Sequence, residues 1–149
     1  MTQATPSRNA GALLDAHLQF IATDIERWLE LFAEDAVVEF PYAASLGLPE
    51  RLEGREAIRQ YFIETPKHFR GLVFTKVRRY LTTEPDVAMG EVHGSATIGT
   101  TGRAYEQDYV MLLKSREGKI SLYREYWNPI PGLKAFGGEE SLRRAVSAS

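Results

Sequence analysis

Glu125 is the first residue of this sequence that could carry chemistry, because it lies among aromatic residues at the end of a predicted strand. The segment REYWNP covers residues 124–129, and its Asn-Pro pair ends the strand. Side chains alternate between the two faces of a strand, so Glu125 shares its face with Tyr123 and Trp127. A carboxylate in these surroundings is either a solvated surface charge or a buried group with a raised pKa that can move protons.

Asp108 is the second candidate, because strand register can bring it to the same face as Glu125. Predicted strands at 103–115 and 119–128 are joined through Glu117-Gly118. A two- or four-residue loop puts Asp108 and Glu125 on one face, about 7–8 Å apart on a diagonal. One of two such carboxylates would have a raised pKa, which gives an acid and a base in one site. A three-residue loop or a bulge would reverse the parity and leave Asp108 solvated on the outer face.

The three histidines are weaker candidates. His68 follows a predicted helix, where it could act as a favourable cation or as an acid/base group. His93 alternates with Glu91 and Ser95, and this polar row fits a ligand site, a solvated face or an oligomer interface. His17 lies on an apolar helix face and is expected to be a histidine of the core or of a pocket rim. The histidine spacing matches no metal motif, and the chain has no cysteine and no glycine-rich phosphate loop, so we expect neither metal nor cofactor.

Composition is that of a single globular domain. The chain has 149 residues, of which 44% are hydrophobic, and a formal net charge of -2. A weak negative charge without a basic stripe gives no electrostatic reason for nucleic-acid binding. No signal-peptide pattern and no apolar run of about 18 residues is present. We therefore expect a cytoplasmic protein that binds neither nucleic acid nor membrane.

The hydrophobic pattern predicts helices first and then a meander of long strands, which indicates an α+β fold. Helices are expected at 9–22, 24–32 and 54–65, and strands at 36–42, 71–83, 87–100, 103–115 and 119–128. Residues 1–8 are expected to be disordered, 9–130 to form the domain, and 131–149 to be a tail that covers the sheet or an oligomer partner.

Three segments together resemble the NTF2-like superfamily in its SnoaL-like and ketosteroid-isomerase-like branch. They are WLELFAEDAVVEFPY (28–42), LEGREAIRQYF (52–62) and the four-strand meander. The ending REYWNPIPGLKAFG (124–137) is similar to that of PhzA/PhzB-like proteins. The resemblance implies a cone of curved antiparallel sheet closed by three N-terminal helices, as in cystatin-like α+β barrels, with a deep apolar pocket. It also implies a homodimer through the sheet face.

The resemblance assigns roles to single positions. Where steroid isomerases have their aspartate base, this chain has Phe40, which argues against steroid isomerisation by that mechanism. Asp108 falls near their second, protonated aspartate and near the acid/base aspartate of polyketide cyclases. Glu125 matches the pocket glutamate of PhzA/PhzB-like proteins. Their helix histidine falls on Tyr61, with His68 further along, which argues against phenazine chemistry itself.

These considerations predict cofactor-independent acid/base catalysis on a small hydrophobic, cyclic or aromatic metabolite. The reaction would be an isomerisation, cyclisation, condensation or dehydration. A non-catalytic binding or dimeric interaction module of the same fold is the alternative, and a scaffold with a filled pocket is a third. The predicted catalytic residues are Glu125, Asp108 and His68, and the predicted substrate-binding residues are Phe40, Tyr42, Tyr61, His93, Tyr123 and Trp127.

Overall fold

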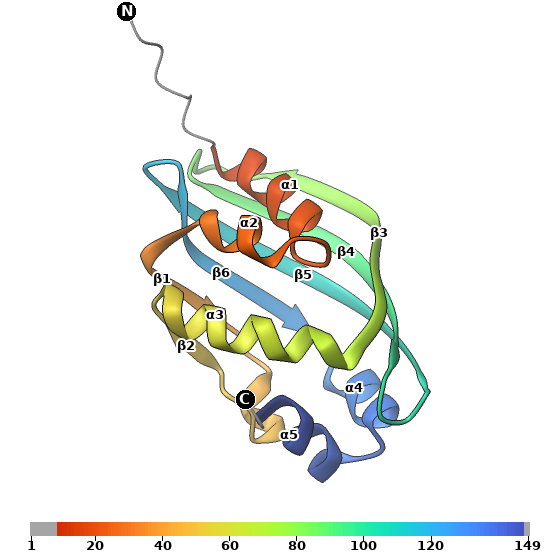
Figure 1. Ribbon diagram of the computed structural model, residues 1–149. Coiled ribbons are helices and arrows are strands. Elements are labelled where there is room, and N and C mark those ends of the chain that lie inside the picture. The colour runs from red at the N-terminus through yellow and green to blue at the C-terminus, as the bar shows by residue number, and fades with distance from the viewer. Residues whose placement is uncertain (1–8, 148–149) are drawn as a thin grey trace, which may run out of the picture.

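The computed structural model describes residues 9–147, which form a curved six-stranded sheet with helices against one side (Figure 1). The strand order is β2-β1-β6-β5-β4-β3. The helices are α1 (Ala10–Phe20), α2 (Ile25–Glu30), α3 (Arg55–Glu64), α4 (Pro129–Phe136) and α5 (Glu139–Ser147). The strands are β1 (Phe32–Glu39), β2 (Arg51–Glu53), β3 (Phe69–Leu81), β4 (Val87–Ile98), β5 (Ala104–Arg116) and β6 (Lys119–Trp127). The segment expected to be disordered, residues 1–8, lies outside the described residues.

The predicted fold class is confirmed. Three N-terminal helices lie across the sheet, and β3 to β6 form the expected antiparallel meander (Figure 1). The sheet is curved but open, since β2 and β3 are its two edges. The first strand begins earlier than predicted, at Phe32, and the ring of this residue packs into the core beside Trp28. Short β2 was not predicted; it pairs with β1 through Val38 and Leu52.

A β-bulge in β6 sets the register of the sheet centre. Arg116 pairs with Lys119 and Ser115 with Ile120, so the loop has two residues, one of the two lengths considered above. Lys114 then pairs with Leu122, which leaves Ser121 as an extra residue in β6. A bulge of one residue exchanges the faces of everything beyond it relative to the partner strand. Glu125 therefore pairs with Met111, and the inner faces of β5 and β6 are not those predicted from the loop alone.

The main core lies between the sheet and the first three helices. Asn9 and Asp24 start α1 and α2 by accepting backbone N–H groups through their side chains, which satisfies donors that helix ends leave free. Trp28, Ile58 and Phe32 then pack fully buried under the sheet. This core fixes α1 and α2 against one half of the sheet.

The C-terminal residues form two further helices at one end of the sheet (Figure 1). Asn128 caps α4 by accepting from the Ile130 N–H, and Pro129 occupies the first helical position, which suits a residue without an N–H. Gly137, with φ of 85°, ends α4 in the left-handed conformation. Among residues 9–147, no helix is long and apolar enough to cross a membrane.

Candidate functional site

A cavity lies between the inner face of the sheet, α3 and the two C-terminal helices. Its walls enclose about 880 Å³, counting the part that opens to solvent. Aromatic and aliphatic side chains dominate the lining, and α4 and α5 contribute Phe136, Leu142 and Val146. The polar groups of the lining are few and come mainly from β5, β6 and the start of α4: Tyr61, Thr65, Tyr105, Gln107, Tyr109, Glu125 and Asn128. A concave, mostly apolar site with a few polar groups is the usual form of a small-molecule pocket.

Glu125 is the one carboxylic acid among the described residues that line this cavity. It points inward from β6, and the Tyr123 hydroxyl donates a hydrogen bond of 2.5 Å to its Oε2. Burial raises the pKa of Glu125 to about 7, and the Tyr123 hydrogen bond opposes part of that rise. Protein surrounds the carboxyl group, yet the side chain keeps some accessible surface because it faces the open cavity. At neutral pH this group can therefore both accept and release a proton.

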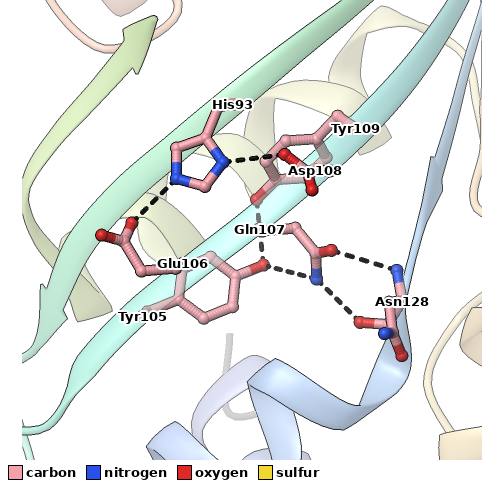
Figure 2. Close-up of polar contacts among 7 residues, drawn as sticks. All are labelled: His93, Tyr105, Glu106, Gln107, Asp108, Tyr109 and Asn128. Carbon is pink, nitrogen blue, oxygen red and sulfur yellow. Dashed lines mark hydrogen bonds and ion pairs between the residues drawn. The ribbon is translucent and has the colours of Figure 1, made fainter.

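Tyr105, Gln107 and Tyr109 form a hydrogen-bonded row on the inner face of β5 (Figure 2). The Gln107 amide donates to Asn128 O (2.7 Å) and to the Tyr105 hydroxyl (3.3 Å), and its Oε1 accepts from Asn128 N (3.1 Å). The hydroxyl groups of Tyr105 and Tyr109 lie 3.0 Å apart. One of their two protons joins the pair, so the other is free to be donated to a ligand.

The tyrosines around the cavity are protonated at neutral pH. Burial raises the pKa of Tyr105 to about 12 and raises the pKa values of Tyr61 and Tyr109 as well, and the nearby Glu125 charge adds to each rise. Each hydroxyl is thus a neutral hydrogen-bond donor. The cavity combines one titratable carboxyl group with several fixed phenol donors.

Tyr123 connects Glu125 to the core below the cavity. Its side chain is fully buried, and its ring centroid lies 4.4 Å from that of His17 on α1. The Trp28 indole N–H donates to His17 Nδ1 at 2.8 Å. Burial lowers the pKa of His17 to about 3, so this histidine is neutral, and of the two expected positions the structure shows the core.

The predicted binding residues divide into two groups. Phe40, Tyr61 and Trp127 line the cavity together with Glu125. Tyr123 lies behind this lining and reaches it only through its hydroxyl group. These positions follow the predicted alternation along β6, where Tyr123, Glu125 and Trp127 share a face.

Asp108 does not share that face, and the prediction that it neighbours Glu125 in the pocket is wrong. Its side chain is 91% exposed on the opposite side of the sheet (Figure 2). There the imidazole of His93 lies between Asp108 (Nδ1 to Oδ1, 2.8 Å) and Glu106 (Nε2 to Oε2, 3.1 Å). The cause is the bulge at Ser121, which reverses the parity of the β5–β6 pair.

His93, His68 and Tyr42 also lie outside the cavity lining. Hydrogen bonds to Asp108 and Glu106 raise the pKa of His93 on the outer face. His68 ends a 3₁₀ turn after α3, with its ring 6.3 Å from that of Phe136. Tyr42 is 49% exposed and packs edge-on against Tyr126. Within residues 9–147, no three His, Asp or Glu side chains are grouped so that they could hold a metal ion.

Sequence reasoning missed Tyr105, Gln107 and Tyr109 as site residues. They alternate with Glu106 and Asp108 along β5, so the reversed parity that a bulge produces would have selected them. The helices α4 and α5 were also missed as walls of the cavity. The Asn-Pro pair at 128–129 could have signalled a helix start as well as a strand end.

Comparison with known proteins agrees with this fold. The family model of the SnoaL-like domain matches residues 14–123. The chain belongs to the SnoaL-like family. The uncharacterized PhzA/B-like protein PA3332 of Pseudomonas aeruginosa is 39% identical over 142 residues, which cover 95% of this chain and 99% of that protein. The predicted resemblance is thereby confirmed.

Two solved structures share the fold of this SnoaL-like chain. A candidate isomerase from Bacillus subtilis is 36% identical, with a TM-score of 0.80 over 87% of this chain and 93% of its own. RV0760c from Mycobacterium tuberculosis, solved in complex with estradiol-17beta-hemisuccinate, is 25% identical, with a TM-score of 0.68 over 80% of this chain and 93% of its own.

Proposed function

We propose that this SnoaL-like protein catalyses a cofactor-independent proton transfer on a small hydrophobic, cyclic or aromatic molecule bound in the cavity. The observation that carries the proposal is the carboxyl group of Glu125, which has a pKa of about 7 in a mostly apolar cavity and is the one carboxyl group of the described lining. A general base is most effective when its pKa lies near the working pH. In this cavity, desolvation raises the pKa of Glu125 to a value near neutral pH.

In the proposed reaction, ionised Glu125 takes a proton from a carbon next to a carbonyl group of the substrate. Negative charge then develops on the carbonyl oxygen, and the free hydroxyl proton of the Tyr105–Tyr109 pair can stabilise it. Gln107 supports this role because its amide donates to the Tyr105 hydroxyl oxygen, so the hydroxyl proton that is left free in the tyrosine pair points away from Gln107. Glu125 returns its proton at another position of the substrate, so no proton or electron is gained or lost overall.

This scheme favours an isomerisation or a cyclisation, the reaction types that need only proton movement. The 36% identity to a candidate isomerase supports the same class. The steroid derivative bound by the mycobacterial relative supports a ligand with a rigid hydrophobic ring system. Phe40 in place of an aspartate, and Tyr61 in place of a histidine, argue that the substrate differs from those of the steroid isomerases and the phenazine proteins.

Hydrogen exchange of a probe ketone tests the proposal. With 2-tetralone in D2O, the native protein should accelerate deuterium incorporation next to the carbonyl group, with a rate that rises as pH increases through about 7. Glu125→Gln should reduce this exchange by about 100-fold or more, because the base is lost. Equal exchange by both proteins would exclude Glu125 as the base. Binding of 2-tetralone without accelerated exchange would favour the non-catalytic binding protein.

We also infer a homodimer formed through the outer face of the sheet. In the described part of the chain the helices lie on the other side (Figure 1), and Val110, Leu112 and Tyr126 are half-buried on the outer face. Leu112→Lys should then shift the sedimenting species from a dimer to the 16.8 kDa chain while the circular dichroism spectrum stays unchanged. A native protein that sediments as a monomer would contradict this inference.

A further inference from the structure

The Tyr123 hydroxyl group holds one oxygen of the Glu125 carboxyl group. Both side chains lie on the inner face of β6, two residues apart, and the hydroxyl donates to Oε2 at 2.5 Å. Oε1 receives no hydrogen bond from the described residues, so it is the oxygen left for a ligand in the cavity. A carboxyl group bound at one oxygen loses the rotation that would otherwise exchange the two.

Tyr123 is itself fixed from behind. Its ring has no exposed surface and lies against the His17 ring at a centroid distance of 4.4 Å and an angle of 47°. His17 has no exposed surface either, and Trp28 donates to its Nδ1, which assigns the ring proton to Nε2. Trp28 in turn packs edge-on against Phe32 at 4.6 Å. Residues of α1, α2 and β1 thus restrain the ring that carries the hydroxyl group.

We propose that Tyr123 is a positioning residue of the site, which orients Glu125 so that Oε1 faces the ligand, and that the His17–Trp28 pair fixes Tyr123 in that role. The inference rests on the proposed function, in which Glu125 carries the proton. It adds a group behind the cavity that contacts no ligand and still sets how Glu125 reacts. Sites whose reacting group is restrained by a packed second layer hold it in productive geometry.

The hydrogen bond has a second consequence, on the proton affinity of Glu125. The groups that face this carboxyl group are the neutral phenols Tyr61, Tyr105, Tyr109 and Tyr123, and no Lys, Arg or His side chain lines the cavity among the described residues. Burial raises the pKa of Glu125, and the Tyr123 hydrogen bond is the interaction that lowers it. Without Tyr123, the carboxyl group would remain protonated to higher pH and would be a less available base.

Tyr123→Phe tests the proposal, with Tyr126→Phe as the matched control on the outer face of the same strand. The titration of Glu125 is followed by the carboxyl ¹³C signal that disappears in Glu125→Gln. Tyr123→Phe should move the midpoint upward from about 7 by about one pH unit, whereas Tyr126→Phe should leave it unchanged. An unchanged midpoint in folded Tyr123→Phe protein would overturn the proposal.

Exchange kinetics give the matching functional measurement. At pH 7, a base whose midpoint rises by one pH unit is ionised about five-fold less, so kcat for 2-tetralone exchange should fall about five-fold with KM little changed. Raising the pH should restore most of this loss. A loss that appears in KM, or one that high pH does not reverse, would assign Tyr123 to binding or to folding instead.

The native protein provides a test that does not depend on the stability of Tyr123→Phe. The Tyr123 hydroxyl proton should resonate far downfield while Glu125 is ionised, and this signal should be lost in Glu125→Gln and when Glu125 is protonated. A hydroxyl proton signal that does not change as Glu125 is titrated would contradict the hydrogen bond. The carboxyl titration and the hydroxyl proton signal do not require turnover. Both can therefore support the role of Tyr123 when the exchange assay finds no catalysis, and both can contradict it when catalysis by Glu125 is observed.

Discussion

Glu125 on β6 pairs with Met111 on β5, and this register turns Asp108 to the opposite side of the sheet. The pair is displaced from the register that the Glu117-Gly118 loop alone would give, because Ser121 bulges out of β6. Among the described residues, the lining of the cavity therefore includes one carboxyl group instead of two. The pKa of Glu125 rises through burial, without a neighbouring carboxylate.

Glu125→Gln should change how stability depends on pH. The folded-state pKa of Glu125 is raised from 4.5 to about 7, so the native state binds this proton more tightly than the unfolded chain. Below pH 4.5, Glu125 is protonated in both states and its burial as a charge costs no folding free energy. As the pH rises from there to about 7, the unfolded chain releases this proton before the native state does, so the free energy of unfolding falls. Glu125→Gln removes this loss, so urea unfolding should find it more stable than the native protein at pH 8 by up to about 3 kcal/mol. If the free energies of unfolding of Glu125→Gln and the native protein differed by the same amount at pH 4 and at pH 8, the raised pKa would be contradicted.

Asp108→Asn should leave the cavity unaffected. Its carboxylate lies in solvent beside His93, so its removal should lower the pKa of His93 and leave 2-tetralone exchange unchanged. The His93 titration is measured from its imidazole signals by NMR. Asp86→Asn, which changes a turn carboxylate away from His93, serves as the control for charge alone. Loss of 2-tetralone exchange in Asp108→Asn would indicate that Asp108 acts in the cavity, and would contradict the register that the bulge at Ser121 produces.

The contrast between Glu125 and Asp108 indicates how far the sequence could be interpreted. Alternation along one strand correctly grouped Tyr123, Glu125 and Trp127, because that periodicity depends only on local backbone geometry. Grouping across two strands needed the register, and one inserted residue reversed it without any sign in composition. Ser121 is an ordinary strand residue, so nothing in its type distinguished it.

The helices α4 and α5 were missed for a different reason. Residues 129–132 contain two prolines and a glycine, a composition typical of a loop. The helix α4 forms nevertheless, because Asn128 caps it and because its apolar side covers the cavity. Tertiary packing outweighs a weak local preference here. The N-terminal helices were predicted because caps and apolar spacing agree there.

Gly94→Ala should disturb the tyrosine pair from the neighbouring strand. A Cβ atom at this position would lie 2.9 Å from the Tyr109 ring and 3.4 Å from the Phe74 ring, so the Tyr109 ring must move. We expect a stability loss of about 1–2 kcal/mol and slower 2-tetralone exchange, since the hydroxyl of Tyr109 would leave that of Tyr105. Gly99→Ala, whose Cβ would meet only ordinary contacts with Arg70, is the matched control. Similar behaviour of the two variants in thermal unfolding and exchange would contradict this role of Gly94.

Gln107→Leu should loosen the connection between β5 and α4. Gln107 satisfies both the N–H and the C=O of Asn128, the residue that caps α4, and it donates to Tyr105 as well. Leucine leaves these backbone groups unpaired, at a cost of about 2–3 kcal/mol. Amide hydrogen exchange should become faster in α4 and α5 than in α1, because the residue that caps α4 is no longer held to β5, while the core beneath α1 is unchanged. Gln60→Leu, at an exposed position of α3, controls for the change of residue type. Uniformly faster exchange in all helices would indicate global destabilisation and would contradict a specific link to α4.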